Sequence, residues 1–290
     1  MILFKGGFAT VYLAIWKDGP LEHDYDKKIY KRDNYKEVAL KCINNSQNIT
    51  KEFLDEIKAY SIKKSHNIVK IYGISQEPIT KNYVIILQYD KYGSIIICDA
   101  KRDILHDIMR GLREIHQRQM VHRDFHIGNI LFTIDNNAKC YDTFRYNTGL
   151  FISVQISDMG LCGEVDNTNK SKIFGVTPYV APEVLRGKPY TQAADIYSFG
   201  MIMYFTLTGS QPFENRAHDS LLALDIYNRP NIELINSILD ENYHNYDKEF
   251  GEAEKCFNEY KESNQLTTTH SQAVYTSQLL NPYTEGLAID

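Results

Sequence analysis

The sequence predicts an α+β protein, because strand patterns occupy its N-terminal part and helical patterns follow. Short runs of alternating or β-branched apolar residues indicate strands at residues 2–16, 37–43, 70–73 and 83–87. Apolar residues recur at helical spacing in 104–115, and 195–207 is apolar on nearly all sides, as in a helix at the centre of a domain. With 290 residues, 43% of them apolar, the chain can build one large domain or two lobes.

The net charge argues against a nucleic-acid-binding or membrane-binding protein, and the cysteine spacing argues against a cysteine metal site. The formal net charge is -5 and the pI is near 6.0, with Lys and Arg scattered, so we expect no nucleic acid or anionic membrane as the main partner. The five cysteines have no metal-ligand or C-x-x-C spacing, which is typical of reduced thiols inside a cell. The sequence shows no signal peptide and no membrane-spanning run. We therefore expect a cytoplasmic protein, whose oligomeric state the sequence does not predict.

The first two strands, within residues 2–16, are separated by Gly6-Gly7. Two glycines between strands form a common hairpin turn, which by itself needs no ligand. The chain begins almost at the first strand, so we expect a preceding segment to be missing from this product. A charged connection from Lys17 to Tyr35 follows, and we expect it to be solvated.

The next strand, Glu37 to Ile43, contains Lys41 among apolar residues. The following segment is predicted to be a helix, because Phe53, Ile57 and Tyr60 recur at i, i+4 and i+7. Glu56 lies beside that apolar stripe. The alternative is that Lys41 and Glu56 have no functional role and are ordinary solvated side chains.

The run from Val121 to Phe132 places Asp124 and Asn129 five positions apart on a polar loop that an apolar segment follows. A carboxylate there can accept a proton from an attacking hydroxyl, and a carboxamide oxygen can bind a hard cation. Taken alone, the loop is equally consistent with a surface cluster. Residues 134–153 then form an extra polar segment, which we interpret as a surface insertion.

Taken together, the motifs resemble those of protein kinase domains, most closely the tyrosine-kinase-like (TKL) group and its expanded fungal sets. The matching motifs, in chain order, are V-A-L-K at 38–41, H-R-D-x-x-x-x-N at 122–129, D-M-G at 158–160, A-P-E at 181–183 and the helix that Asp195 opens. The resemblance implies a two-lobed fold with an abbreviated N-terminus and C-lobe. It implies a mainly β N-lobe at 1–90, a mainly α C-lobe at 91–240 with an activation segment at 158–183, and a peripheral helix with a disordered tail at 241–290.

The resemblance also implies roles for individual residues. Asp124 would accept the proton of a protein hydroxyl, Lys41 would pair with the ATP phosphates and with Glu56, and Asn129 and Asp158 would bind Mg²⁺. Leu87 would be the gatekeeper, and Gln88, Tyr89 and Asp90 the hinge. The nucleotide would contact Gly6, Gly7, Val11, Ala39, Lys41, Leu87, Gln88, Tyr89, Asp90 and Leu131. The implied reaction is transfer of the γ-phosphoryl group of ATP to a protein substrate in intracellular signalling.

Two departures from the family pattern keep other classes open. Phe4, Gly6 and Ala9 stand at the three positions of the family's glycine loop, which favours a pseudokinase or scaffold as the alternative. The loop pattern D-x-H-x-x-N also resembles kinases that act on choline or aminoglycosides, although the A-P-E segment and Asp195 argue against them. Val176 stands where serine/threonine kinases usually have a threonine. The sequence therefore does not predict whether the substrate hydroxyl belongs to serine or threonine or to tyrosine.

The position of Arg123, directly before Asp124, predicts regulation by phosphorylation. A guanidinium there can bind a phosphorylated residue of the activation segment, and Thr168 and Ser171 lie in the polar middle of that segment. The alternative is that Arg123 only bonds backbone carbonyls. Arg229 is expected to pair with Glu183 if it replaces the family's late arginine.

Overall fold

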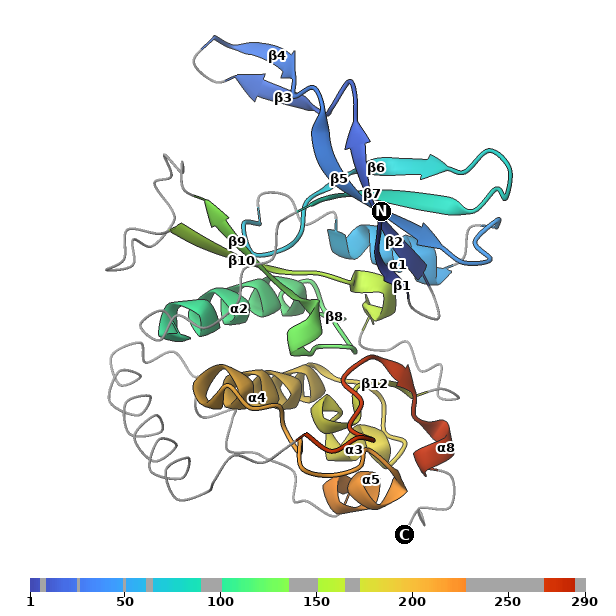
Figure 1. Cartoon of the computed structure of the whole chain (residues 1–290), viewed down its shortest axis with the longest axis vertical. Coiled ribbons are helices and arrows are strands. Elements are labelled where there is room, and N and C mark those ends of the chain that lie inside the picture. The colour runs from blue at the N-terminus through green and yellow to red at the C-terminus, as the bar shows by residue number, and fades with distance from the viewer. Residues whose placement is uncertain are drawn as a thin grey trace.

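The structure, a computed structural model, describes residues 1–5, 9–24, 27–48, 51–60, 65–89, 101–135, 151–164, 173–227 and 269–284. A sheet with one helix forms its N-terminal part and helices dominate its C-terminal part, which confirms the two-lobed α+β fold (Figure 1). The elements of the N-terminal part are β1 (Ile2–Lys5), β2 (Ala9–Trp16), β3 (Leu21–Asp24), β4 (Ile29–Arg32), β5 (Lys36–Ile43), α1 (Lys51–Tyr60), β6 (Ile71–Gln76) and β7 (Tyr83–Gln88).

The main sheet has five antiparallel strands in the order β1-β2-β5-β7-β6. Its register places Val11 opposite Lys41 and Ala39 opposite Leu87. Ala39 and Lys41 are two residues apart in β5, so their side chains lie on the same face of the sheet. A buried lysine at the edge of an apolar face needs a charged partner, and α1 supplies it.

The connection between β2 and β5, expected only to be charged and solvated, contains a hairpin. Residues 21–24 and 29–32 pair as the hairpin β3–β4, which projects away from the sheet in Figure 1. All four residues of β4 are exposed, so the hairpin buries no face and shows no apolar pattern by which it could be predicted. The expectation that this segment is solvated agrees with that exposure.

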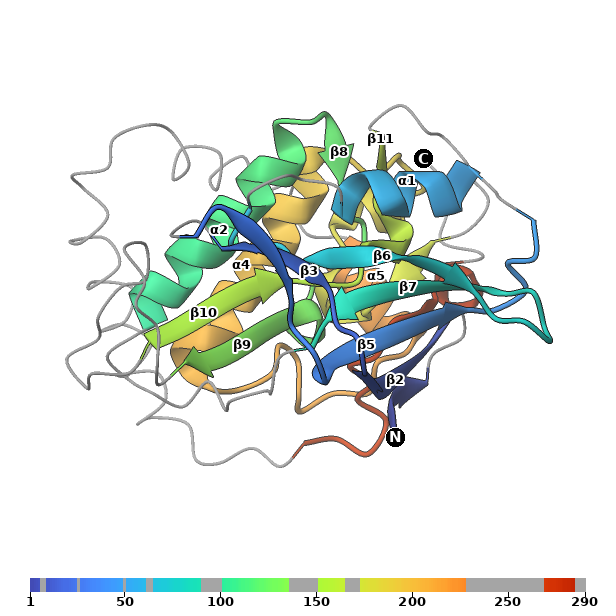
Figure 2. The ribbon, with the colours of Figure 1, turned by 90° about the horizontal axis from the view of Figure 1, so that it is seen from above.

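Helix α1 presents its expected stripe to the sheet and to the turn that contains Met159. Phe53 and Tyr60 are buried, whereas Leu54 on the opposite side is 48% exposed. Asp55 and Glu56 are also buried. In Figures 1 and 2, α1 lies along the sheet, on the side of the helical part of the molecule.

The C-terminal part is built around two long helices, α2 and α4. Ile104, Ile108, Leu112 and Ile115 of α2 are at most 1% exposed and join the main core. The Thr191 side chain caps α4 by accepting the Ala194 N–H. The elements here are α2 (Lys101–His116), β8 (Met120–Val121), β9 (Ile130–Asp135), β10 (Phe151–Ile156), β11 (Gly163–Glu164), β12 (Phe174–Gly175), α3 (Pro182–Leu185), α4 (Gln192–Thr208) and α5 (Ser220–Tyr227), with the short 3-10 turns η2 (Ile127–Asn129), η3 (Met159–Leu161) and η4 (Thr177–Tyr179).

The expected surface insertion at 134–153 begins and ends inside a hairpin. Strands β9 and β10 pair over six residues, from Ile130 opposite Ile156 to Asp135 opposite Phe151. Residues 136–150 lie outside the described part of the chain. Within the described part, no helix is long and apolar enough to cross a membrane.

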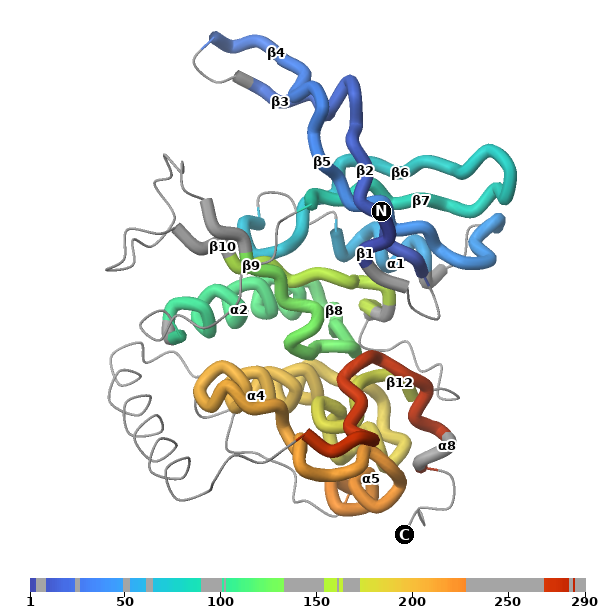
Figure 3. The backbone as a smooth tube through the Cα atoms, viewed as in Figure 1, coloured from blue at the N-terminus to red at the C-terminus, as the bar shows by residue number. Residues whose placement is uncertain are grey.

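The prediction of a disordered tail is wrong for residues 269–284. Strand β13 (Gln278–Leu279) pairs with β12, and the short helix α8 (Asn281–Thr284) follows it (Figure 3). Leu280, between them, is fully buried. The pairing partner lies about a hundred residues earlier in the chain, which local periodicity cannot indicate. The expected peripheral helix at 247–262 falls outside the described residues.

Candidate active site

Lys41 lies between two carboxylates at the junction of the sheet, α1 and the D-M-G turn. Its Nζ is 2.6 Å from Glu56 Oε1 and 2.6 Å from Asp158 Oδ1. The side chains of Lys41 and Glu56 are buried, whereas that of Asp158 is 41% exposed. The structure thus brings together three of the residues predicted from the sequence, with an oxygen-bearing group of Asp158 facing solvent.

The charges of Lys41 and Asp158 hold each other in the ionised form, whereas burial raises the pKa of Glu56 in spite of the neighbouring Lys41 ammonium. Burial lowers the pKa of Lys41, but the carboxylates of Asp158 and Glu56 outweigh it, so that pKa lies well above its ordinary value. Burial raises the pKa of Asp158, and the neighbouring Lys41 ammonium more than compensates, so the pKa of Asp158 is lowered. A fixed ammonium beside a fixed carboxylate can bind phosphate oxygens and a cation together.

The D-M-G turn is held tightly against α1. Asp158 adopts a left-handed conformation with φ of 53° and accepts the Gly160 N–H at 3.3 Å. The fully buried Met159 donates its backbone N–H to the Tyr60 hydroxyl at 3.3 Å. Burial raises the pKa of that hydroxyl, so Tyr60 is neutral. Sequence reasoning used Tyr60 only as an apolar helix position and missed this hydrogen bond, because its partner is a backbone group 99 residues away.

The H-R-D loop is fixed by Asp195, in the first turn of α4. Asp195 is 1% exposed and accepts the backbone N–H groups of His122 at 2.7 Å and Arg123 at 3.0 Å. Its Oδ2 also lies 2.9 Å from His116 Nε2, a contact that no sequence motif indicated. Arg123 has φ of 69°, a conformation that a non-glycine residue keeps only where its surroundings impose it.

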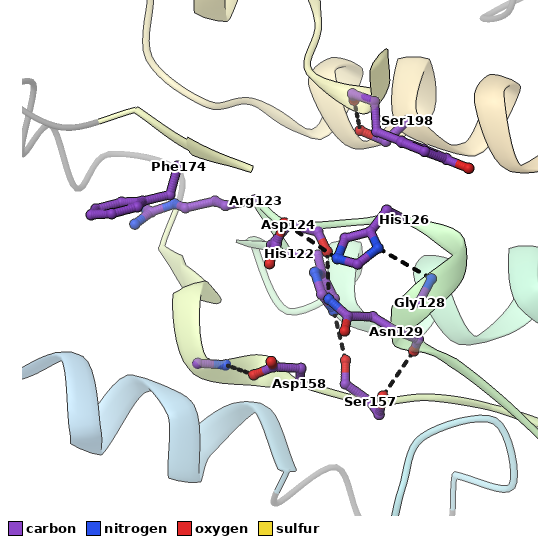
Figure 4. Close-up of polar contacts among 12 residues, drawn as sticks. His122, Arg123, Asp124, His126, Gly128, Asn129, Ser157, Asp158, Phe174 and Ser198 are labelled. Atoms are coloured by element: carbon purple, nitrogen blue, oxygen red, sulfur yellow. Dashed lines mark hydrogen bonds and ion pairs between the residues drawn. The ribbon is translucent and has the colours of Figure 1, made fainter. Parts of the chain in front are cut away.

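Asp124 and Asn129 lie together in this loop (Figure 4). The Asn129 Nδ2 donates to the Asp124 carbonyl at 2.8 Å, and the Asn129 carbonyl accepts the backbone N–H and the hydroxyl of Ser157. The Asp124 carboxylate is buried, and its Oδ1 has no hydrogen-bond partner among the described residues. A buried acceptor oxygen without a partner is a suitable receiver for a substrate hydroxyl.

His126 adds a group beside Asp124 that was not among the predicted site residues. Its Nδ1 accepts the Gly128 N–H at 3.1 Å, so the neutral ring carries its proton on Nε2. Nε2 lies 3.6 Å from Asp124 Oδ1, too far for a direct hydrogen bond. The D-x-H-x-x-N pattern was the signal that could have indicated this histidine.

The residues expected to contact the nucleotide base come from both parts of the fold, since Leu131 belongs to β9 and the others to the N-terminal part. Ala39, Leu87 and Leu131 belong to the main buried cluster, and Val11 and Tyr89 pack against it. Gln88 ends β7 and donates its N–H to the Lys70 carbonyl at 2.9 Å. Gly6, Gly7 and Asp90 lie outside the described residues, as do Thr168, Ser171 and Arg229.

Comparison with known proteins gives a consistent result. The model of the protein kinase domain matches residues 27–274. A Dictyostelium discoideum protein named "Probable serine/threonine-protein kinase" is 27% identical over 231 residues, which is 72% of this chain and 15% of that protein. The calcium/calmodulin-dependent protein kinase type 1 of Caenorhabditis elegans is 28% identical over 235 residues, 77% of this chain and 59% of that protein.

The DNA damage response protein kinase of Saccharomyces cerevisiae is 30% identical over 202 residues, 62% of this chain and 39% of that protein. The chain therefore spans less than two thirds of the length of each of these three relatives. The family match covers most of the chain and includes Lys41, Asp124, Asp158 and Asp195. The chain belongs to the protein kinase domain family.

Proposed function

We propose that this protein is an ATP-dependent protein kinase of the TKL type, which phosphorylates serine or threonine residues of an intracellular protein substrate. The observation that carries the proposal is the position of Lys41, bound at 2.6 Å by both Glu56 and Asp158. This arrangement supports a site in which the Lys41 ammonium would bind phosphate oxygens and the adjacent Asp158 carboxylate would bind a metal ion. The named relatives that act on serine or threonine support the choice of hydroxyl.

The donor atoms present fit a magnesium ion. Mg²⁺ prefers carboxylate and carbonyl oxygens, and Asp158 and Asn129 supply one of each. The Asn129 amide nitrogen bonds the Asp124 carbonyl, which leaves the amide oxygen as the atom that meets a cation. When bound, the ion supplies charge neutralisation for the transferred phosphoryl group. Val11, Ala39, Leu87 and the hinge would hold the adenine, with Gly6 and Gly7 over the phosphates.

In the proposed reaction, the substrate hydroxyl oxygen forms a bond to the γ-phosphorus of ATP. The bond from that phosphorus to the β,γ-bridging oxygen breaks, and ADP leaves. Asp124 accepts the hydroxyl proton at its carboxylate, whose Oδ1 is unpaired among the described residues. Lys41 stays bonded to Glu56 and Asp158 and orients the phosphates, so the protein acts mainly by positioning and by charge.

The test is transfer of radiolabel from ATP to a mixture of serine, threonine and tyrosine peptides, with the Asp124→Asn variant as control. We expect label on serine or threonine peptides with the parent protein only. Equal transfer by Asp124→Asn would exclude Asp124 from the chemistry. Absence of transfer by the parent protein, together with intact ATP binding, would favour the pseudokinase alternative.

Activation by phosphorylation of Thr168 or Ser171 is a further part of the proposal. Arg123 is the cation that would bind the phosphate, and its guanidinium lies close to Gly163 of β11, at the start of the activation segment. A Thr168→Ala/Ser171→Ala double variant should therefore lose activity relative to the parent. Undiminished activity would show that the segment is ordered without modification.

A further inference from the structure

Residues 269–284, which we call the C-terminal segment, lie against the end of the activation segment. Phe174 pairs with Leu279, and Gly175 pairs with Gln278. Leu280 donates its N–H to the Ile173 carbonyl at 2.7 Å, and Ile173 donates its N–H to Asn281 Oδ1 at 2.8 Å. Phe174 and Gly175 thus pair as a strand with the C-terminal segment, and Ile173 extends the contact by two hydrogen bonds.

This pairing occurs next to the catalytic carboxylate. A Cβ atom built on Gly175 would lie 3.9 Å from Asp124 Oδ1, so the Gly175 backbone is adjacent to Asp124. Gln278 pairs directly with Gly175, so only the β12 strand separates it from the Asp124 carboxylate. An extended substrate that is to present its hydroxyl to Asp124 must pass through this region.

Packing of Leu280 and several hydrogen bonds also hold the C-terminal segment in place. Leu280 is 0% exposed and packs in a cluster with Val184, Leu222 and Ile226, whereas its neighbour Leu279 is 39% exposed. Tyr275 donates its hydroxyl to the Pro212 carbonyl at 2.9 Å. The loop between α4 and α5 also bonds the segment. The Val274 N–H donates to His218 Nδ1, and the His270 N–H donates to the Glu214 carbonyl.

We infer that the edge of β12 is a peptide-docking site that binds extended chains by strand addition, and that the C-terminal segment is its intramolecular occupant. The ligand class follows from the contacts: an extended peptide with a leucine whose side chain enters the cluster of Leu222 and Ile226, followed by an asparagine that accepts the Ile173 N–H. One edge can pair with one strand, so the segment and a protein substrate compete. The competition rests on the proposed function, whereas docking itself does not.

The first experiment locks the segment in place by a disulfide. Phe174 and Leu279 are directly opposite, at a separation that a disulfide between two strands can bridge, so a Phe174→Cys/Leu279→Cys variant is expected to cross-link on mild oxidation. The oxidised form should phosphorylate added peptides about tenfold or more slowly than the reduced form, because tethering keeps the local concentration of the segment high. Its thermal stabilisation by MgATP should not change.

Equal peptide phosphorylation in both redox states would overturn the competition, and failure to cross-link would overturn the pairing. The single Phe174→Cys variant controls for bonds to native cysteines. Binding of ATP serves as the reference in both states. If neither state transfers phosphate, the proposed function fails, and docking is decided by the binding experiment below.

The second experiment measures docking without enzymatic activity. Leu280→Ala removes the buried anchor, and Leu279→Ala is the matched control at a partly exposed neighbour. A fluorescent peptide with the sequence of residues 269–284 should bind Leu280→Ala at least about tenfold more tightly than it binds Leu279→Ala or the parent, whose own segment competes. Equal weak binding to all three would contradict the docking site.

The same pair of variants separates docking from a purely structural role. A competing segment predicts a lower KM for peptide substrate in Leu280→Ala and an unchanged KM for ATP. A segment that only completes the core predicts a higher KM or a loss of kcat. In that case the peptide in trans would restore the activity instead of inhibiting it, and the inference would be wrong.

Discussion

Gly160→Ala tests whether the three-charge cluster positions the nucleotide. A Cβ atom at residue 160 would lie 3.0 Å from Lys41 Nζ and 3.2 Å from Asp158 Oδ1, both closer than ordinary van der Waals contact. The lysine is the end of a flexible side chain, so it must move by a few tenths of an ångström. Such a movement lengthens its bonds to Glu56 and Asp158.

The cost follows from the distances. At an effective dielectric constant of about 20, lengthening a 2.6 Å ion pair by about 0.4 Å weakens it by about 0.9 kcal/mol. The full loss of about 0.9 kcal/mol applies to the buried pair of Lys41 with Glu56. Water screens the pair of Lys41 with the half-exposed Asp158, so that pair loses less. The sum is about 1 to 1.5 kcal/mol, which corresponds to a fall of about 5- to 13-fold in kcat/KM for ATP.

Steady-state kinetics with varied ATP, and thermal unfolding with and without MgATP, provide the assay. Gly73→Ala is the matched control, because an added Cβ at Gly73 has no atom within 4 Å. We expect wild-type nucleotide kinetics for Gly73→Ala and the reduced kcat/KM for Gly160→Ala. If the two variants behave alike, the position of Lys41 does not limit nucleotide use, and the reasoning is refuted.

Three further predictions concern the same site. Tyr60→Phe leaves the buried Met159 N–H without its acceptor and should lower the free energy of unfolding by about 1 to 2 kcal/mol, which urea denaturation measures; an unchanged midpoint would mean that water replaces the hydroxyl. Asp124→Asn should lower the rate of phosphate transfer by about 10²- to 10⁴-fold while calorimetry shows nearly unchanged ATP affinity. Lys41→Met and Asp158→Ala should abolish most of the rise in Tm that millimolar MgATP gives the parent protein, and no rise in the parent would contradict the nucleotide site.

The fold could be predicted because its motifs carry local signals in a fixed order. The apolar strand around Lys41, the amphipathic stripe of α1 and the uniformly apolar α4 are each recognisable from a short stretch of sequence. The hairpin β3–β4 was not predicted, since its exposed strands have no apolar face to reveal it. The strand β13 was missed for a different reason: two residues are too short for a pattern, and its stability comes from partners far away in the chain.

The candidate site shows the same division between local and distant signals. Lys41 and Asp158 are 117 residues apart, and only the family resemblance connects them before the structure does. Tyr60 and His116 carry no motif, because each acts through one polar atom on a side chain that otherwise fits an apolar or surface helix position. Such residues are found only when the hydrogen-bond partner of each buried polar group, backbone or side chain, is identified.

The contacts of Asp195 explain how the H-R-D loop keeps its conformation. The left-handed backbone at Arg123 is unfavourable by itself, and the buried Asp124 Oδ1, which has no hydrogen-bond partner among the described residues, adds to that cost. Asp195 offsets both by accepting two consecutive backbone N–H groups and the His116 ring from within the core. Asp195 thereby fixes the loop, so Asp124 can keep a buried carboxylate oxygen without a hydrogen bond among the described residues, which a substrate hydroxyl would supply in the proposed reaction.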